Sequence, residues 1–527
     1  MKNIFNALLL ILFLPSVKIN AQIIFQKTYN INPQNNDWTA SSIQTYDGGY
    51  ILTGTTLGTL TPDIFLLKTD INGNMLWSKT YGGTDVDEAS SIRQTSDSGY
   101  IICGYTLSFP PYGSNTYLIK TDHNGNLQWT RTYNWNMNPD DGISIEQTND
   151  GGFIITGGIG SILDVYVIKT DSVGQVMWAK SFGGSNDDRG YCVKQTYDGG
   201  FIISGEGGTW GSAPYLIRLN SNGNLMWSKV YLASNGTIHL YGTPTTVTET
   251  DDHGFILTSS VQIIPGIHDM VIIRTDSSGN TMWAKSFGGN ADDLEGSATQ
   301  TTDRGYLISG ISNSFSAGDY DVYIVKIDSV GNLIWSKTYG GTNNDGDVLH
   351  LFGYETSDGG VALASTTNSF GPNTESHIYF IKTDANGISG CEEGDPATIT
   401  SSIAVFDSTP GTIETSENTI AIMQTTLTDL DTNIMNSLCF YDGIGISTSS
   451  PTIEISPNPT LGKIKIESSF SKIKSAEIFN LLGEDIYAPS VTNSQHLTIN
   501  CSPFPPGIYF VRTQTENGAV IQKFIKE

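Results

Sequence analysis

The chain has 527 residues and a formal net charge of −26, and only 15% of its residues are charged. An acidic surface of this kind repels nucleic acid and anionic lipid, which excludes both as expected partners. Glycine is abundant, with 57 residues, and no long segment has the apolar period of a helix. The composition therefore favours a large all-β protein with many turns.

Residues 1–21 (MKNIFNALLLILFLPSVKINA) combine Lys2, a short apolar run and a small residue at Ala21. This pattern is typical of a secretory signal peptide, and the apolar run is too short to cross a bilayer. No Cys follows Ala21, so we do not expect a lipid anchor. The mature protein is expected to be soluble and exported.

Four short strand patterns recur about every 50 residues after the signal peptide. In the repeat that begins at residue 90 they read SSIRQT, YIICGYT, TYLIKTD and NLQWTRTY, with tight turns at Asp97–Gly99 and Asp122–Gly125. In such turns Asp accepts a local hydrogen bond and Gly takes a positive φ. Four strands per unit at this spacing are typical of a β-propeller blade.

The first turn of the unit occurs seven times, whereas the strand that carries a tryptophan occurs six times. The N-terminal segment IIFQKTYN supplies the missing strand, because Phe25 takes the tryptophan position 52 residues before Trp77. We therefore predict an all-β chain in which residues 22–390 form a seven-bladed β-propeller, closed by its N-terminal strand. Deleting residues 22–31 is expected to open the last blade, whereas removing residues 391–527 is not.

The spacing Asp-x-x-Gly-x-x-x-Trp resembles the tryptophan-docking repeat of quinoprotein propellers, although it is one residue shorter between Asp and Gly. The resemblance implies that the aromatic ring packs between adjacent blades, and we do not extend it to a quinone cofactor. We predict this core position for Phe25, Trp77, Trp129, Trp178, Trp227, Trp283 and Trp335.

A Gln or Glu recurs near the end of each first strand and either lines a channel or hydrogen-bonds neighbouring backbone near the axis. We favour the second interpretation. These residues are Gln44, Gln94, Gln147, Gln195, Glu249, Gln300 and Glu355.

Long, irregular loops are expected on one face of the propeller, and short turns on the other. Trp38, Trp135 and Trp210 fall on the long-loop face, where they either stack on a ligand or pack locally. No cofactor is expected, because the acids lack the spacing of a calcium loop. Calcium at the acidic loops is the alternative. These acids either form a site or cap turns, and they are Asp85/Asp87, Asp140/Asp141, Asp187/Asp188, Asp292/Asp293 and Asp345/Asp347.

Residues 391–450 lose the repeat, are rich in Thr, Ser and Ile, and are expected to form a β-rich spacer. Cys391 stands where a seventh tryptophan should be, and a disulfide between Cys391 and Cys439, which bracket the segment, is predicted. Cys103 and Cys192 lie in strand patterns and are expected to be buried free thiols. With five cysteines in the chain, disulfides do not hold the fold together.

Residues 451–527 contain strand patterns broken by Pro, Asn and Gly, enough for a small β-sandwich. Their motifs resemble the type A C-terminal sorting domain of the type IX (Por) secretion system of Bacteroidetes-type bacteria. The resemblance implies that type IX machinery carries the protein across the outer membrane, after which it is attached to the surface or released. The matching motifs contain Pro457, Asn458, Pro459, Gly462, Gly483, Gly507, Tyr509 and Lys523.

Two hypotheses about function follow. We favour a monomeric, non-catalytic binding or scaffold protein, secreted or at the cell surface, whose loop-rich face binds a glycan or a protein. The alternative is a secreted glycan hydrolase or lyase, which needs two carboxylates about 5–10 Å apart in a cleft. The loop acids recur at the same place in several repeats, and this repetition favours a structural role for them.

Overall fold

The computed structural model of this protein is all-β, and the described part of the chain contains no helix. No described segment is a helix long and apolar enough to span a membrane. The expected signal peptide, residues 1–21, lies outside the described residues. The structure describes residues 22–526 without 33–34, 58–60, 110–112, 136–139, 160–163, 185–186, 208–212, 234–245, 265, 347–351, 372–374, 404, 409–412, 417–419, 424–433, 443–452, 457–458, 461, 469–471, 481–484, 488–493 and 516–517.

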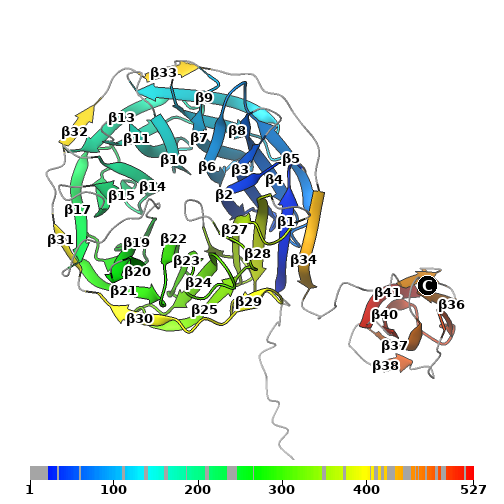
Figure 1. Ribbon diagram of the computed structural model, residues 1–527. Coiled ribbons are helices and arrows are strands. Elements are labelled where there is room, and N and C mark those ends of the chain that lie inside the picture. Colours follow the sequence, from blue (N-terminus) through cyan, green and yellow to red (C-terminus); the bar gives the residue numbers. More distant parts are fainter. Residues whose placement is uncertain are drawn as a thin grey trace, which may run out of the picture.

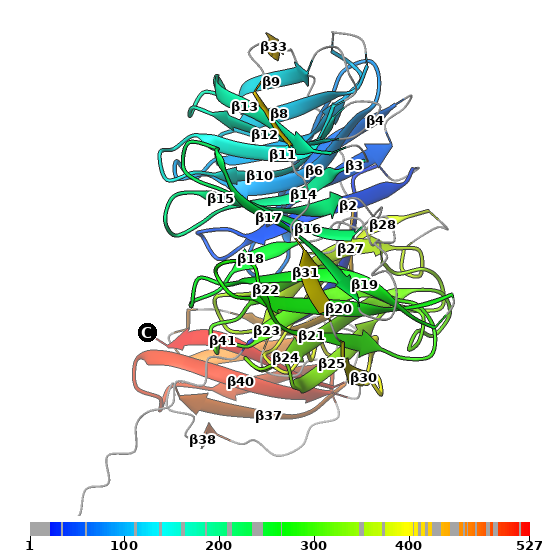
Figure 2. The ribbon, with the colours of Figure 1, turned by 90° about the vertical axis from the view of Figure 1, so that its left-hand side faces the viewer.

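Seven antiparallel sheets of four or five strands are built from residues 23–442. Figure 1 shows them arranged around a common centre, and Figure 2 shows the same ring from its edge. The innermost strands are β2 (Asp37–Gln44), β6 (Asp87–Gln94), β10 (Asp140–Gln147), β14 (Arg189–Gln195), β18 (Val247–Glu249), β22 (Asp293–Gln300) and β26 (Tyr354–Glu355).

Two middle strands follow in each sheet, and a fourth strand lies toward the outside. The second strands are β3 (Tyr50–Leu57), β7 (Tyr100–Thr106), β11 (Phe153–Ile159), β15 (Phe201–Gly207), β19 (Phe255–Ile264), β23 (Tyr306–Ser312) and β27 (Val361–Thr367). The third strands are β4 (Pro62–Thr69), β8 (Asn115–Thr121), β12 (Asp164–Thr170), β16 (Ala213–Leu219), β20 (Ile267–Thr275), β24 (Asp321–Ile327) and β28 (His377–Thr383). The fourth strands are β1 (Ile23–Asn30), β5 (Met75–Tyr81), β9 (Leu127–Trp135), β13 (Val176–Gly183), β17 (Leu225–Ala233), β21 (Thr281–Gly288) and β25 (Leu333–Tyr339).

The middle strands are apolar on both faces because each sheet packs between two others. One core cluster, for example, joins Ile101 and Leu118 of one sheet to Ile155 and Ile168 of the next, and all four side chains are buried. Burial on both faces explains the continuous apolar runs of these strands, since no face is left for polar side chains.

An aromatic ring on each fourth strand contacts a glycine of the next sheet. Gly223 has a φ of +75°, and a Cβ there would lie 2.7 Å from the ring of Trp178. Glycine is therefore required twice, by the backbone conformation and by the ring that fills the side-chain position. The same relation joins Phe25 to Gly73, Trp77 to Gly125, Trp129 to Gly174, Trp227 to Gly279, Trp283 to Gly331 and Trp335 to Gly387. Phe25 is fully buried, and the six tryptophans are partly buried.

Two polar contacts accompany the aromatic ring. The hydroxyl of Tyr81 donates a hydrogen bond to the carbonyl oxygen of Gly125 at 2.6 Å, and the Nζ atom of Lys79 donates to Asn126 Oδ1 at 2.9 Å. Tyrosine-to-glycine bonds recur in other sheets, from Tyr29 to Gly73, Tyr133 to Gly174, Tyr231 to Gly279 and Tyr339 to Gly387. Each fourth strand of this kind therefore fixes both the position and the orientation of its neighbouring sheet.

The first and last parts of the ring meet at two places. Strand β1 pairs antiparallel with β28, with Phe25 opposite Lys382, as expected for the N-terminal strand. The second place lies near the axis, where Gln44 of the first sheet accepts a hydrogen bond from Ser357 N of the last. The repeated Gln or Glu of each sheet accepts the same kind of bond from a backbone N–H in the turn of a neighbouring sheet. The favoured interpretation of these residues is therefore confirmed. The contacts are Tyr46–Gln94, Ser96–Gln147, Asn149–Gln195, Tyr197–Glu249, Asp251–Gln300, Thr302–Glu355 and Ser357–Gln44, at 2.7–3.1 Å.

The segment that follows residue 390 adds a fifth strand to six of the sheets, in reverse chain order. Its strands pair with β25, β21, β17, β13, β9 and β1, and Figure 1 shows them along the outside of the ring. The segment is β-rich, as expected of the spacer, and its strands also cover outer strand edges of the sheets. The strands are β29 (Glu393–Gly394), β30 (Ile399–Ser402), β31 (Val405–Ser408), β32 (Ile413–Ser416), β33 (Ile420–Met423) and β34 (Ile434–Asp442).

The cysteines fall into two groups. Cys103, Cys192 and Cys501 are buried free thiols, as expected for the first two. Cys391 is disulfide-bonded, and its carbonyl oxygen accepts a hydrogen bond from Gln26, the residue opposite Cys439 in the β1–β34 pairing. The side chain of Cys439 lies outside the described residues, so the pairing with Cys391 stays a prediction.

The C-terminal part forms two further sheets that enclose one core. Ile464 and Ile499 of one sheet and Ile478 and Val511 of the other belong to the same buried cluster. The strands are β35 (Ile453–Ser456), β36 (Lys463–Ser468) and β39 (His496–Asn500) in one sheet, and β37 (Ile473–Asn480), β38 (Asp485–Tyr487), β40 (Gly507–Thr515) and β41 (Gly518–Lys526) in the other.

The expected sorting motifs are partly placed by these strands. Tyr509 is buried and its hydroxyl donates a hydrogen bond to the carbonyl oxygen of Pro505 at 2.9 Å, while Gly507 begins β40. Lys523 is exposed on β41, and Pro459 and Gly462 precede β36. Pro457, Asn458 and Gly483 lie outside the described residues.

The aromatic contact can be separated from backbone strain with two glycine variants. Gly223→Ala is expected to lower the free energy of unfolding by roughly 2–5 kcal/mol, because a positive φ costs about 1–2 kcal/mol and overpacking adds about 1–3. Gly151→Ala should carry only the cost of the positive φ, because Gly151 has a φ of +82° and no atom lies within 4 Å of a Cβ placed there. Denaturant unfolding of both variants measures the difference, and equal losses would contradict the packing role of Trp178.

Candidate functional site

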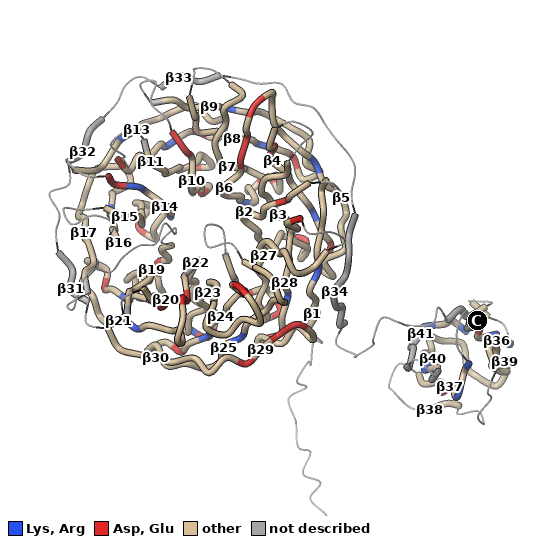
Figure 3. The backbone as a smooth tube through the Cα atoms, viewed as in Figure 1, with Lys and Arg blue, Asp and Glu red and all other residues tan. Residues whose placement is uncertain are grey.

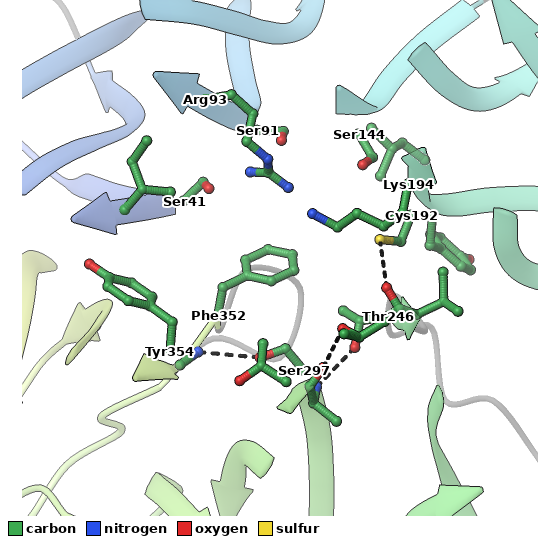
Figure 4. A pocket seen from close by; sticks show the side chains of 18 of the residues that line it. Ser41, Ser91, Arg93, Ser144, Cys192, Lys194, Thr246, Ser297, Phe352 and Tyr354 are labelled. Carbon is green, nitrogen blue, oxygen red and sulfur yellow. Dashed lines mark hydrogen bonds between the residues drawn. The ribbon is translucent and has the colours of Figure 1, made fainter. Parts of the chain in front are cut away.

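The first strands of all seven sheets surround a cavity of about 520 Å³ near the centre of the ring. This volume lies in the range of small-molecule sites in proteins, roughly 300–1,000 Å³. Figure 4 shows side chains from opposite sides of the ring reaching into the same space. The cavity follows from the arrangement of the sheets, because seven strands around one axis leave a central gap between their side chains.

One layer of small polar side chains holds the strands around the cavity together. These residues stand three positions before the repeated Gln or Glu. Ser144 Oγ accepts a hydrogen bond from the backbone N–H of Val193 at 3.3 Å, and Thr246 Oγ1 accepts one from Ala298 at 2.9 Å. Ser297 Oγ accepts one from Gly353 at 3.2 Å. Their role is therefore structural, although they line the cavity.

The residue directly before the repeated Gln or Glu differs in chemical character around the ring. Six of these residues line the cavity: Ile43, Arg93, Lys194, Thr248, Thr299 and Tyr354. The neighbouring positions are constrained by packing and by hydrogen bonds that recur from sheet to sheet, so this position can vary without disturbing the ring. Sequence reasoning missed these residues. They could have been found because they differ from repeat to repeat, next to a position that is Gln or Glu in every repeat.

The charged groups near the cavity differ in how they are neutralised. Lys194 Nζ lies 2.8 Å from Glu146 Oε2. Glu249 accepts hydrogen bonds from Tyr197 N at 2.8 Å and lies 3.2 Å from His253 Nδ1. Among the described residues, no carboxylate lies within 4.0 Å of the guanidinium nitrogens of Arg93, although Figure 3 shows acidic residues all around the ring.

The three tryptophans proposed for the long-loop face are not brought together by the described residues. Trp38 is partly buried and lines a second pocket of about 330 Å³, together with Leu294, Ile311 and Tyr320. The backbone of Trp135 ends β9, but its side chain lies outside the described residues, and so does the whole of Trp210. A shared tryptophan surface stays a prediction.

Acids that follow the fourth strands by a few residues cap the loops there. Asp87 Oδ2 accepts a hydrogen bond from Gly83 N at 2.7 Å, and Asp293 Oδ2 accepts one from Gly289 N at 2.7 Å. Asp188 and Asp345 make the same contact with Gly184 and Gly341. These acids are buried, which supports the interpretation that they cap turns. Asp347 lies outside the described residues.

Several of these caps lie near a second aspartate on the third strand of the preceding sheet. Burial, and to a smaller extent the Asp87 charge, raises the pKa of Asp63 to about 6. Burial together with Asp293 raises the pKa of Asp269 to about 7, and burial together with Asp345 raises that of Asp321 to about 7. None of these aspartates lines the axial cavity. In the described part of the chain, no group of three or more His, Cys, Asp or Glu side chains is placed to hold a metal ion.

Comparison with known proteins identifies the C-terminal part. Residues 454–527 match the family described as the secretion system C-terminal sorting domain, which confirms the expected sorting domain. The domain indicates export across the outer membrane to the cell surface or the extracellular space, and it implies interaction with the type IX secretion machinery. No curated protein matches the chain.

Among solved structures, the chain is similar to a protein of unknown function from Dyadobacter fermentans, with 11% identity, a TM-score of 0.41, and coverage of 69% of this chain and 99% of that one. It is also similar to Sqt1 from Chaetomium thermophilum, with 12% identity, a TM-score of 0.36, and coverage of 74% of this chain and 99% of that one. At these scores the likenesses carry no argument about function.

The buried aspartates predict how stability depends on pH. An unfolded Asp titrates near 3.8 and folded Asp321 at about 7, so the folded state binds more protons between these values. The stability from protonated Asp321 is fully present below the unfolded pKa and is lost as pH rises through the folded pKa. Unfolding free energy measured from pH 4 to pH 8 should therefore fall less steeply in Asp321→Asn than in the parent.

Asp303→Asn is the matched control for this experiment. Burial raises the pKa of Asp303, but hydrogen bonds from Lys326 and Thr301 outweigh it and lower the pKa to about 2. Its contribution is therefore lost only as pH falls toward that value, and the slope between pH 4 and pH 8 should not change. An unchanged slope in Asp321→Asn would contradict the buried, protonated state of that carboxyl group.

Proposed function

We propose that this protein is an exported binding protein built on a seven-bladed β-propeller, in which the axial cavity holds part of a glycan. The β1–β28 pairing and the seven Gln or Glu contacts around the axis support closure of the ring. The proposed organisation places the signal peptide at 1–21, the propeller at 22–390, the outer strands at 391–450 and the sorting domain at 451–527. The protein works as a monomer.

The axial cavity is the observation that carries the proposal. Its size suits a sugar unit, and aromatic side chains at Tyr191, Phe352 and Tyr354 line it. Aromatic rings present apolar faces on which sugar rings stack, and tyrosine adds a hydroxyl for hydrogen bonding. Trp38, beside the second pocket, offers a further surface of the same kind.

Binding is favoured over catalysis by the carboxylates at the cavity. Among the described residues that line it, Glu249 is the one carboxylate, whereas glycoside hydrolysis ordinarily uses two facing carboxyl groups. The aspartates with raised pKa recur as buried pairs away from the cavity, which suits a structural role.

A variant that fills the cavity tests the binding proposal. Ile43→Trp adds volume at a lining position and is expected to abolish binding on a glycan array, while Leu76→Trp, on the exposed side of β5, should leave it unchanged. Thermal unfolding of each exported variant checks that the ring is intact. Binding by Ile43→Trp equal to the parent's would place the ligand elsewhere, and an array without any bound glycan would overturn the glycan assignment.

Truncation tests the route of export. A chain that ends at residue 450 keeps residues 1–21 and lacks the sorting domain, so it should accumulate in the periplasm. The full chain should appear outside the cell or on its surface, shortened at both ends. Cell fractionation and mass spectrometry of both termini measure this, and equally efficient export of the truncated chain would contradict the role of residues 454–527.

A further inference from the structure

We propose that the axial cavity selects a sugar that carries a negatively charged group, a carboxylate or a phosphate, and that Arg93 is the residue that binds this group. The inference rests on the proposed function and deepens it, because it names the chemical class of the sugar.

Arg93 is placed to bind an anion from outside the chain. It is partly buried on β6, and its Nη1 atom donates a hydrogen bond to the carbonyl oxygen of Ile92 at 2.7 Å. The other guanidinium donors have no carboxylate within ion-pair distance among the described residues. A guanidinium presents its donors as a planar fork that matches carboxylate and phosphate oxygens, so an anionic ligand complements the group.

The remaining charges around the cavity do not cancel Arg93. Lys194 adds a second cation, which Figure 4 shows reaching into the same space as Arg93, but Glu146 already lies 2.8 Å from its Nζ atom. The Glu249 carboxylate accepts the backbone N–H of Tyr197 and contacts His253, so it is engaged away from Arg93. Among the described residues that line the cavity, the basic side chains of Arg93 and Lys194 therefore outnumber the one acidic side chain, Glu249, in a chain whose net charge is −26.

Aromatic side chains of the same cavity suit the body of a sugar. Figure 4 shows the ring of Phe352 reaching toward the middle of the cavity and Tyr354 nearer its edge, and both belong to the last sheet of the ring or the segment that leads into it. A guanidinium without a carboxylate partner among the described residues and aromatic faces around the same cavity together describe an acidic sugar.

Calorimetric titration of the exported protein with glucuronate, glucose 6-phosphate and glucose tests the inference, because these probes share a ring and differ in charge. At least one acidic sugar should bind tighter than glucose, and the acid that binds tighter identifies the charged group. Arg93→Gln should weaken acidic-sugar binding about 10- to 100-fold and leave glucose binding within about twofold, because a charge-assisted hydrogen bond is lost. Arg93→Lys should recover part of the loss.

Arg304→Gln is the matched control, since this arginine lies in a turn outside the cavity with its side chain 76% exposed, and binding should not change. Equal affinity for all three sugars, an unchanged affinity in Arg93→Gln, or no binding of any of the three by a protein that binds the glycan array would each overturn the inference and leave the proposed function standing. An array without binding would overturn the proposed function itself.

Discussion

The contact between an aromatic ring and a glycine of the next sheet is the constraint on which the ring depends. Each fourth strand presents Trp or, once, Phe25, and the neighbouring turn presents a glycine whose missing side chain makes room for it. Flat rings of similar size at every interface set a nearly constant spacing between sheets. Where a tyrosine follows, as at Tyr81, its hydroxyl fixes the tilt as well. Repetition of one contact therefore makes a ring from sheets that cannot bury their apolar faces alone.

The same repetition limits the positions at which side chains can serve binding. Packing fixes the outer positions, and the polar layer and the repeated Gln or Glu fix most of each inner strand. What remains is the position directly before the repeated Gln or Glu, which lines the cavity in six of the sheets, and there the repeats differ most, from Ile43 to Arg93 and Tyr354. A rigid ring that holds a few varied side chains around a central space is well suited to preorganised binding.

Local patterns predicted much of this architecture. The repeat placed the turns, Phe25 and the pairing of β1 with β28, because these features need only short spacings. The ion pairs that join a buried Lys or Arg to the first turn, such as Lys120 with Asp97 at 2.9 Å, were missed although the Lys-Thr-Asp run repeats visibly. The outer strands after residue 390 were missed for a different reason. They are two to nine residues long, and their partners lie up to 419 positions away (Ile23 and Asp442), so nothing local marks the pairing.

The varied side chains that line the axial cavity were the least predictable part. Arg93 is one charge in an ordinary strand, and only the meeting of seven strands makes it unusual. The central claim is that the seven sheets form a closed ring, in which β1 pairs with β28 in the last sheet. Hydrogen exchange measured by mass spectrometry on the exported protein tests it most directly. Amides of β1 (Ile23–Asn30) should be protected as strongly as those of β9 (Leu127–Trp135), which like β1 lies between a third strand and an added fifth strand. Exchange of β1 at the rate of an exposed loop, with β9 protected, would contradict the closed ring.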